Sequence, residues 1–392
     1  MRSKKILNWI WLSLAIVCGC VQGCSVAADN QPSLSPLASI GAQAFVDETL
    51  SASGRQSCAS CHAAETGHSA VNALAVQLGG INLDIQGLRN SQTLRYLVKN
   101  TPFHFDEEGT PTGGFFWDGR ANSLAGQAAG PLLGAREMAN PDKASVVVKI
   151  ARSGWANDFK KVFGSDIFQN VDLAFEKLTL AIQQFQIEDA VFNSFTSKYD
   201  AFLLGKASLT NQEARGLALF NDPNKGNCAS CHPSTKGADG SHPLFTDFTY
   251  DNLGVPRNPE ILANSDPTYF DLGLCGRDGL RDRTDLCGAF KVPTLRNVAI
   301  RKSYFHNGKF KSLKDVLTFY VQRDTNPEKW YPRNPDGSIR KFDDLPSLYR
   351  ANINTTEGPY NRNPGDSPAL SESEINDVVV FLNTLTDGWF SR

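Results

Sequence analysis

Apolar side chains recur at helical spacing in four segments of this chain, and the segments come in pairs. Residues 41–45 (Gly-Ala-Gln-Ala-Phe) and 216–220 (Gly-Leu-Ala-Leu-Phe) each precede a copy of the same five-residue motif. Residues 171–186 and 374–385 are amphipathic and come late in each half. The pattern predicts that each half of the chain begins and ends with a helix, so that the whole is an internal repeat.

The remaining chain has little periodicity. Residues 104–114, 233–289 and 324–370 are rich in Gly, Pro, Asn and Asp, a composition that is typical of loops. A length of 392 residues exceeds the usual size of one domain. We therefore expect a mainly α fold with long irregular loops, divided into an N-terminal domain over residues 29–205 and a C-terminal domain over residues 206–392.

The N-terminus is typical of an exported protein. Basic residues precede an apolar run over residues 6–17 that is too short to span a bilayer, which predicts a signal peptide over residues 1–28. Residues 21–24 (Val-Gln-Gly-Cys) also resemble a lipobox, in which Cys24 would be acylated and would anchor the chain to the outer membrane. Both alternatives place the mature chain in the periplasm, where disulfides persist.

The motif that occurs twice is Cys-Ala-Ser-Cys-His, at residues 58–62 and 228–232. Two such cysteines can add to the vinyl groups of a haem, and the adjacent histidine can bind its iron. Zinc also binds paired cysteines, but a zinc site does not explain why a histidine directly follows the second cysteine in both copies. We predict two covalently bound c-type haems, one in each of two cytochrome c-like domains. The haem-binding residues are then Cys58, Cys61, His62, Cys228, Cys231 and His232.

Two further cysteines remain in the mature chain. Three of the nine lie in the signal segment and four belong to the haem motifs, which leaves Cys275 and Cys287. In an oxidising compartment these two are expected to form a disulfide, and two free thiols are the alternative.

The charge of the chain argues against one class of partner. The net charge is only -2 and the isoelectric point is near 6.3, so no broad basic surface is available for nucleic acid. We expect no nucleic-acid partner.

A set of motifs between and after the haem motifs resembles the bacterial di-haem cytochrome c peroxidase and MauG family. The resemblance runs from about residue 40 to 387. It rests on Arg89-Asn90, on Gly-Gly-Phe-Phe-Trp-Asp-Gly-Arg at 113–120, on Gln127, Pro131 and Glu137-Met138, and on residues 290–297 and 304–308.

The resemblance implies that the first haem is the site of peroxide reduction, with His62 as its proximal ligand. Glu137 would be the acid–base group on the other side of the iron, Gln127 would hydrogen-bond the peroxide, and Pro131 would shape the pocket. The chemistry independently supports Glu137, because cleavage of the O–O bond needs a proton moved between the two oxygens. The alternative for Glu137 is a solvated carboxylate at a helix end.

The resemblance also assigns residues between the haems. Trp117 would stand between them and relay electrons, while an ordinary buried tryptophan at a domain interface is the alternative. Asn90 would bind a calcium ion together with the main-chain carbonyls of Arg301 and Ser303. Arg301 departs from the small polar residue that is usual there, which weakens the calcium prediction.

The chain departs from the peroxidase pattern in a second way. Residues 69–89 contain no histidine, although classical peroxidases carry one there that caps the first iron at rest. The first iron is therefore expected to be open without reductive activation. His68 and His104 are the nearest candidates for a substitute, and for both a loop or surface position is the preferred interpretation.

The second iron needs a ligand opposite His232. Peroxidases of the family place a methionine fourteen positions after the residue that corresponds to His306, and MauG has a tyrosine there; in this chain the residue is Tyr320. Tyr320 is therefore expected to bind the second iron, as in the MauG-like branch. His242 and His306 are the alternatives.

These assignments predict an oxidoreductase that acts on hydrogen peroxide. In the first hypothesis it is a peroxidase that takes electrons from a small cytochrome c or cupredoxin. In the second it is a MauG-like oxidase that modifies a partner protein. A non-catalytic electron carrier is a third hypothesis, which the missing histidine and Glu137 argue against.

Overall fold

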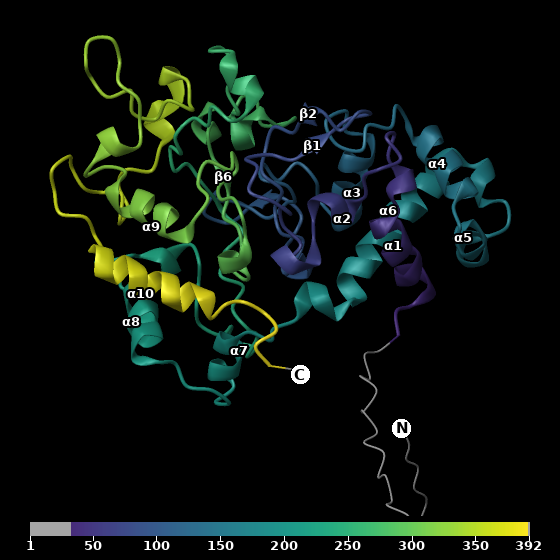
Figure 1. Cartoon of the computed structure of the whole chain (residues 1–392), viewed down its shortest axis with the longest axis horizontal. Helices are drawn as coiled ribbons and strands as arrows, with labels where there is room; N and C mark the ends of the chain where they lie inside the picture. Colours follow the sequence, from purple (N-terminus) through teal and green to yellow (C-terminus); the bar gives the residue numbers. More distant parts are fainter. Residues whose placement is uncertain (1–32, 391–392) are drawn as a thin grey trace, which may run out of the picture. The chain divides into compact units, whose positions relative to one another are not determined.

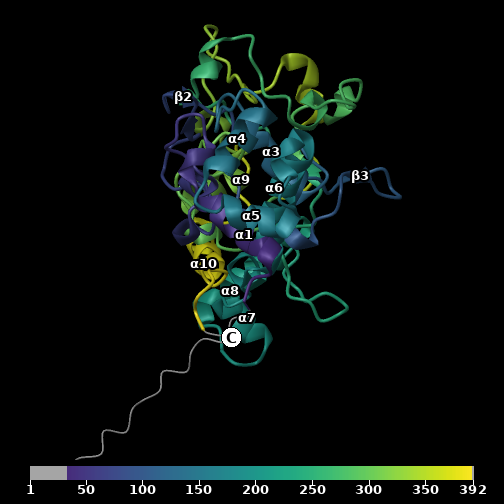
Figure 2. The ribbon, with the colours of Figure 1, turned by 90° about the vertical axis from the view of Figure 1, so that its right-hand side faces the viewer.

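Two pairs of crossing helices, one pair in each half of the chain, define the architecture. In the computed structural model, which describes residues 33–390, α1 (Pro36–Val46) packs against α6 (Val171–Glu188), and α8 (Asn211–Asn221) packs against α10 (Glu372–Asn383). Figure 1 shows both pairs, and Figure 2 shows α1 beside α6 from a second direction. The prediction that each half begins and ends with a helix is confirmed. The predicted signal peptide and Cys24 lie outside the described residues.

The ends of these helices follow from their sequence. Ser35 caps α1 by accepting a hydrogen bond from the N–H of Ala38, and Pro36 occupies the first turn, where its missing N–H costs nothing. Capping boxes begin both helices of the second pair, with Thr210 and Glu213 at α8 and with Ser371 and Glu374 at α10.

A glycine lets the backbones of each pair meet at the crossing. A Cβ on Gly41 of α1 would lie 2.0 Å from the carbonyl oxygen of Ala181 on α6, and a Cβ on Gly216 of α8 would lie 2.1 Å from that of Asp377 on α10. The related segments 41–45 and 216–220 therefore each begin with the glycine at which two helices cross closely.

The other helices are shorter. They are α2 (Cys58–Cys61), α3 (Leu124–Leu133), α4 (Lys143–Arg152), α5 (Ala156–Phe163), α7 (Lys198–Leu203) and α9 (Leu313–Gln322). Among the described residues, none of the helices is both long enough and apolar enough to cross a membrane.

The few strands form two-residue antiparallel pairs. They are β1 (Leu78–Gly79) with β2 (Ile85–Gln86), β3 (His104–Phe105) with β4 (Pro111–Thr112), and β5 (Tyr250–Asp251) with β6 (Phe290–Lys291). The segment 104–114, predicted as a loop, is the β3–β4 hairpin, and Figure 2 shows it projecting outward. The predicted mainly α class with long irregular segments is confirmed.

Buried apolar residues gather in two large clusters. One draws on residues from Ile40 to Ile182 and the other on residues from Tyr199 to Leu385. Tyr199 lies before the predicted boundary at residue 205, yet its ring packs on Phe381 of α10 at 5.5 Å. Cys275 and Cys287 are joined in a disulfide within the irregular segment 233–289.

The helix crossing yields a test of stability. Gly216→Ala should lower the free energy of unfolding by about 1–3 kcal/mol, because the added methyl group forces the backbones of α8 and α10 apart. Gly154→Ala is the matched control, since nothing lies within 4 Å of a Cβ at that position. Chemical denaturation of the purified protein measures both. Equal stability of the two variants would contradict the close contact.

Candidate functional site

The first Cys-x-x-Cys-His motif lies on the wall of a cavity in the N-terminal half. The cavity has an empty volume of about 780 Å³, including space open to solvent. It is lined by all three motif residues and by the predicted peroxide-site residues, namely Cys58, Cys61, His62, Gln127, Pro131 and Glu137. The structure therefore brings together side chains that are up to 79 positions apart in the sequence, from residue 58 to residue 137.

Both motif histidines are oriented in the same way. Nδ1 of His62 lies 3.1 Å from the carbonyl oxygen of His68, and Nδ1 of His232 lies 2.7 Å from that of Phe245. A carbonyl can only accept, so Nδ1 carries the proton in each ring and Nε2 is left as the free lone pair. Burial lowers the pKa of both histidines, which keeps them neutral. Each is in the form that binds iron.

The four motif cysteines are buried thiols. Burial raises the pKa of Cys58 and Cys228 to about 12 and that of Cys61 and Cys231 to about 11, so the free side chains stay protonated. Within residues 33–390, no group of three or more His, Cys, Asp or Glu side chains is arranged to hold a metal ion. The donor set thus fits two thioether bonds and one axial histidine better than a tetrahedral zinc site.

Glu137 is held at the first cavity by its backbone. Its N–H donates to the carbonyl of Gly134 (2.9 Å) and its carbonyl accepts from the N–H of Gly80 (2.8 Å). The side chain folds back over the turn, so that a Cβ on Gly134 would lie 2.4 Å from Oε2 of Glu137. Glu137 is exposed and borders the cavity. The surrounding protein partly desolvates its carboxylate and raises its pKa, against the effect of Arg120. A carboxylate in this setting is a stronger proton acceptor than a solvated one.

Gln127 and Pro131 lie one helical turn apart on α3. Because Pro131 has no N–H, the carbonyl of Gln127 lacks its usual helical donor. The carbonyl of Pro131 itself accepts from the N–H of Met138 (3.1 Å), which ties the end of α3 to the turn that carries Glu137.

The two candidate substitute ligands lie away from the first cavity. His68 is buried beside Phe192, with ring centroids 4.4 Å apart, and its Nδ1 accepts from Nε of Arg95 (3.2 Å). His104 is exposed on β3. Of the residues that line the first cavity, His62 is the one histidine.

The segment from Arg89 to Ser91 forms a wall between the first cavity and a second one. Arg89 lines the first cavity, Asn90 lines the second, and Ser91 lines both. Trp117, which also lines the second cavity, donates its indole N–H to the carbonyl of Asn90 (2.8 Å). The Arg89 guanidinium binds Asp271, on the wall of the second cavity, through two hydrogen bonds of 2.6 and 2.7 Å.

The three predicted calcium ligands are hydrogen-bonded within the protein. The side-chain amide Nδ2 of Asn90 donates to the carbonyl of Ser303 (3.0 Å), and the Ser303 hydroxyl donates to Oδ1 of Asn90 (3.1 Å). The carbonyl of Arg301 accepts from the hydroxyl of Tyr304 (3.1 Å). A donor group of Asn90 thus faces the carbonyl that was expected to bind the ion, and this arrangement does not fit a calcium site.

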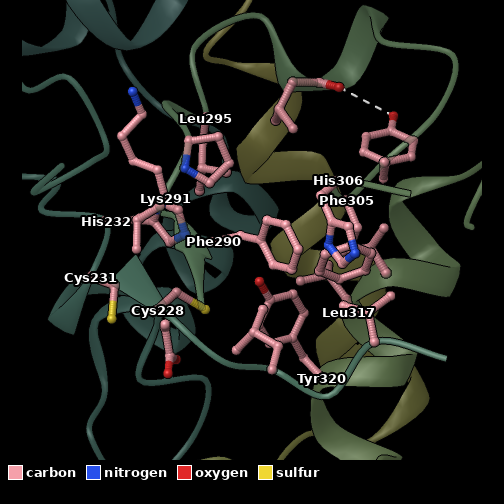
Figure 3. Close-up of a pocket in the computed structure, with 18 of the residues that line it drawn as sticks. Cys228, Cys231, His232, Phe290, Lys291, Leu295, Phe305, His306, Leu317 and Tyr320 are labelled. Atoms are coloured by element: carbon pink, nitrogen blue, oxygen red, sulfur yellow. Dashed lines mark hydrogen bonds between the residues drawn. The ribbon is translucent and has the colours of Figure 1, made fainter. Parts of the chain in front are cut away.

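The second motif lines the larger cavity, which has an empty volume of about 2000 Å³ including open space. Cys228, Cys231 and His232 lie on one side of it and Tyr320 of α9 on the other, with the phenol hydroxyl directed into the pocket (Figure 3). The pKa of Tyr320 is raised by burial and by the charge of Asp251, so that iron would have to displace the phenolic proton.

The two rivals of Tyr320 are engaged elsewhere. Nδ1 of His242 lies 2.6 Å from Oδ1 of Asp200, and His242 is absent from the described wall of the second cavity. His306 does line that wall, but its ring is stacked on Phe290 with centroids 3.6 Å apart and an interplanar angle of 7° (Figure 3).

Sequence reasoning missed several polar residues of the second cavity. Lys291, within the motif at 290–297, is buried; its ammonium group donates to the carbonyl of Gly114, and burial lowers its pKa to about 7. Asp251 and Tyr360 also line the cavity. The last two come from segments without periodicity, so no local signal could have singled them out.

Comparisons with known proteins agree with this geometry. A family model described as di-haem cytochrome c peroxidase matches residues 35–208. The methylamine utilization protein MauG of Paracoccus denitrificans is 33% identical over 377 residues, which cover 94% of this chain and 92% of that protein. Cytochrome c551 peroxidase of Nitrosomonas europaea is 31% identical over 287 residues, 73% of each chain.

A solved structure is similar over nearly the whole chain. The crystal structure of the di-haem peroxidase BthA from Burkholderia thailandensis has a TM-score of 0.84 and 40% identity, and the match covers 91% of this chain and 87% of that one. The family implies two c-type haems, and the two cavities have the residues to hold them. The chain belongs to the di-haem cytochrome c peroxidase and MauG family.

Proposed function

We propose that this protein is a periplasmic di-haem peroxidase that reduces hydrogen peroxide at its first cavity. As a member of the family it is an oxidoreductase that acts on hydrogen peroxide. The observation that carries the proposal is the position of Glu137 in a cavity whose one histidine is His62. His62 would hold the haem iron in that cavity, and Glu137 would serve as a proton acceptor for the peroxide bound there.

The residues of the first cavity would divide the work. A haem held by Cys58, Cys61 and His62 would supply the iron to which peroxide binds. Glu137 would take the proton from one peroxide oxygen and return it to the other, so that the leaving oxygen departs as water. Gln127 would hydrogen-bond the peroxide. The full reaction consumes two electrons and two protons for each peroxide and releases two waters.

The electrons would enter through the second cavity. A small cytochrome c or cupredoxin is the proposed donor, and Trp117 is the proposed relay because its ring lines the second cavity while its indole N–H contacts the wall that both cavities share. In this proposal residues 29–205 and 206–392 each form one cytochrome c-like haem domain. Export depends on the predicted signal peptide, with acylation at Cys24 as the alternative.

A second function is favoured by one observation. Tyr320 lies in the second cavity where a methionine would be expected in a peroxidase, and MauG is among the relatives that match most of the chain. A tyrosine ligand stabilises oxidised iron, which suits an oxidase that uses peroxide to modify a partner protein. Calcium is not included in either proposal, because its predicted ligands already have hydrogen-bond partners.

Glu137→Gln tests the assignment of the acid–base group. The amide keeps the size of the side chain but cannot accept the proton, so peroxide reduction should slow by about 10²-fold or more while both haems stay bound. Glu176→Gln, on the exposed face of α6, is the control and should react like the wild type. Stopped-flow absorbance measures the reaction. Unchanged rates in Glu137→Gln would show that Glu137 is a solvated carboxylate and not the acid–base group.

Tyr320→Phe tests the ligand of the second iron. Loss of the phenol oxygen should change the ferric electron paramagnetic resonance signal of the second haem and leave that of the first unchanged. Tyr304→Phe is the matched control, because Tyr304 lines the same cavity but its hydroxyl donates to main-chain carbonyls. A second-haem signal that survives in Tyr320→Phe and changes in His306→Gln would transfer the ligand role to His306.

A further inference from the structure

Tyr320 has one neighbouring ring that can lose an electron readily. Its described ring contacts are with Phe305, Phe319 and Tyr360, at centroid distances of 5.7, 6.4 and 5.9 Å. A phenol is oxidised far more easily than a benzyl ring, so Tyr360 is the one of the three that could exchange an electron at moderate potential. The two phenols are tilted by 32°, close enough for direct electron transfer between their rings.

The chain segment that carries Tyr360 is fixed against the second haem motif. The N–H of Tyr360 donates to the carbonyl of Glu357 (2.7 Å), and the carbonyl of Gly358 accepts from the side-chain amide of Asn227 (3.0 Å), the residue before Cys228. Tyr360 lines the cavity and is 8% exposed, and the next residue is exposed. The chain segment at Tyr360 therefore runs from the cavity wall to the exposed surface.

The hydroxyl of Tyr360 differs from those of nearby buried tyrosines. Tyr199 and Tyr331 donate to main-chain carbonyls at 2.9 and 2.6 Å. No such bond is found for the hydroxyls of Tyr320 and Tyr360 in the described part of the chain, where both side chains border the cavity.

Two charged side chains act on Tyr360. The guanidinium carbon of Arg323 lies 4.5 Å from the Tyr360 ring centroid. The carboxylate of Asp251 lines the same cavity, where it accepts from the N–H of Asn252 (2.7 Å) and from the side-chain amide of Asn354 (3.2 Å). Burial raises the pKa of Tyr360, and the charge of Asp251 raises it further. Asp251 is therefore the candidate proton acceptor, which oxidation of tyrosine requires at neutral pH.

We propose that Tyr360 is a relay residue that carries oxidising equivalents from the second haem site, past Tyr320, to the protein surface. The inference rests on the proposed function, in which hydrogen peroxide is the oxidant. Tyr360 gives one electron toward the second haem site and its phenolic proton to Asp251, which leaves a neutral phenoxyl radical. A phenol or indole at the surface, such as a Tyr or Trp side chain of a partner protein, restores Tyr360 by donating an electron and a proton. Two such cycles supply the two electrons and two protons that convert one peroxide into two waters.

Tyr360→Phe in the holoprotein tests the relay. One equivalent of peroxide is added without a reductant, samples are frozen at intervals, and the radical is measured by electron paramagnetic resonance. Ring-deuterated tyrosine identifies a tyrosyl signal by narrowing its lines. In Tyr360→Phe the tyrosyl signal should fall by about tenfold or more and the oxidised haem state should decay more slowly. Tyr331→Phe is the matched control, since Tyr331 is a buried phenol that also lies near Arg323 but outside the cavity wall, and its signal should equal that of the wild type.

A spin-trap adduct mapped by mass spectrometry gives an independent result, expected at Tyr360 in the wild type. Peroxide consumption by the wild type with the same tyrosyl signal in Tyr360→Phe would reject the relay and leave the peroxidase proposal intact. A wild type that consumes no peroxide would overturn both. A change in haem content in Tyr360→Phe, with the signal retained per haem, would show a structural role and would also reject the relay.

Discussion

Trp117 donates its indole N–H to the main-chain carbonyl of Asn90, and this hydrogen bond fixes the segment that both proposed haem sites share. Asn90 lies between Arg89, which lines the first cavity, and Ser91, which lines both. Its own N–H donates to the carbonyl of His306 (2.7 Å), so the same residue joins segments from the two halves of the chain. Displacing Asn90 would move the walls of both cavities at once, because close-packed protein interiors transmit such a shift to neighbouring residues.

The long irregular segments of the chain pack around the two cavities. Each half contributes one pair of crossing helices and one Cys-x-x-Cys-His motif, and long segments close over the space between them. A haem in each cavity would bury large apolar surface that side chains alone do not cover. The orientation of His62 and His232 is already set by main-chain carbonyls, which reduces the cost of ordering each ring for iron.

Much of this could be predicted from sequence, for identifiable reasons. The helix pairs follow from apolar periodicity, and the haem motifs are short and specific. The prediction for Tyr320 rests on the family resemblance, which implies a ligand fourteen positions after His306. The roles of Asp251 and Tyr360 could not be predicted, because both lie on segments whose course is set by tertiary contacts and not by local pattern. The calcium prediction did not fit for a similar reason, since only the structure shows that the amide of Asn90 donates to Ser303.

The wall at Asn90 and Trp117 would couple the two sites electronically, and a single-turnover experiment tests this coupling most directly. Holoprotein reduced at its second haem is mixed with one equivalent of peroxide, and oxidation of that haem is followed by stopped-flow absorbance. Trp117→Phe should slow this oxidation by about tenfold or more while the first haem reacts with peroxide at the wild-type rate. Trp155→Phe, a buried tryptophan of the first apolar cluster whose indole N–H donates to Asp47 (2.9 Å), should match the wild type. Equal rates of second-haem oxidation in Trp117→Phe and in the wild type would contradict the account.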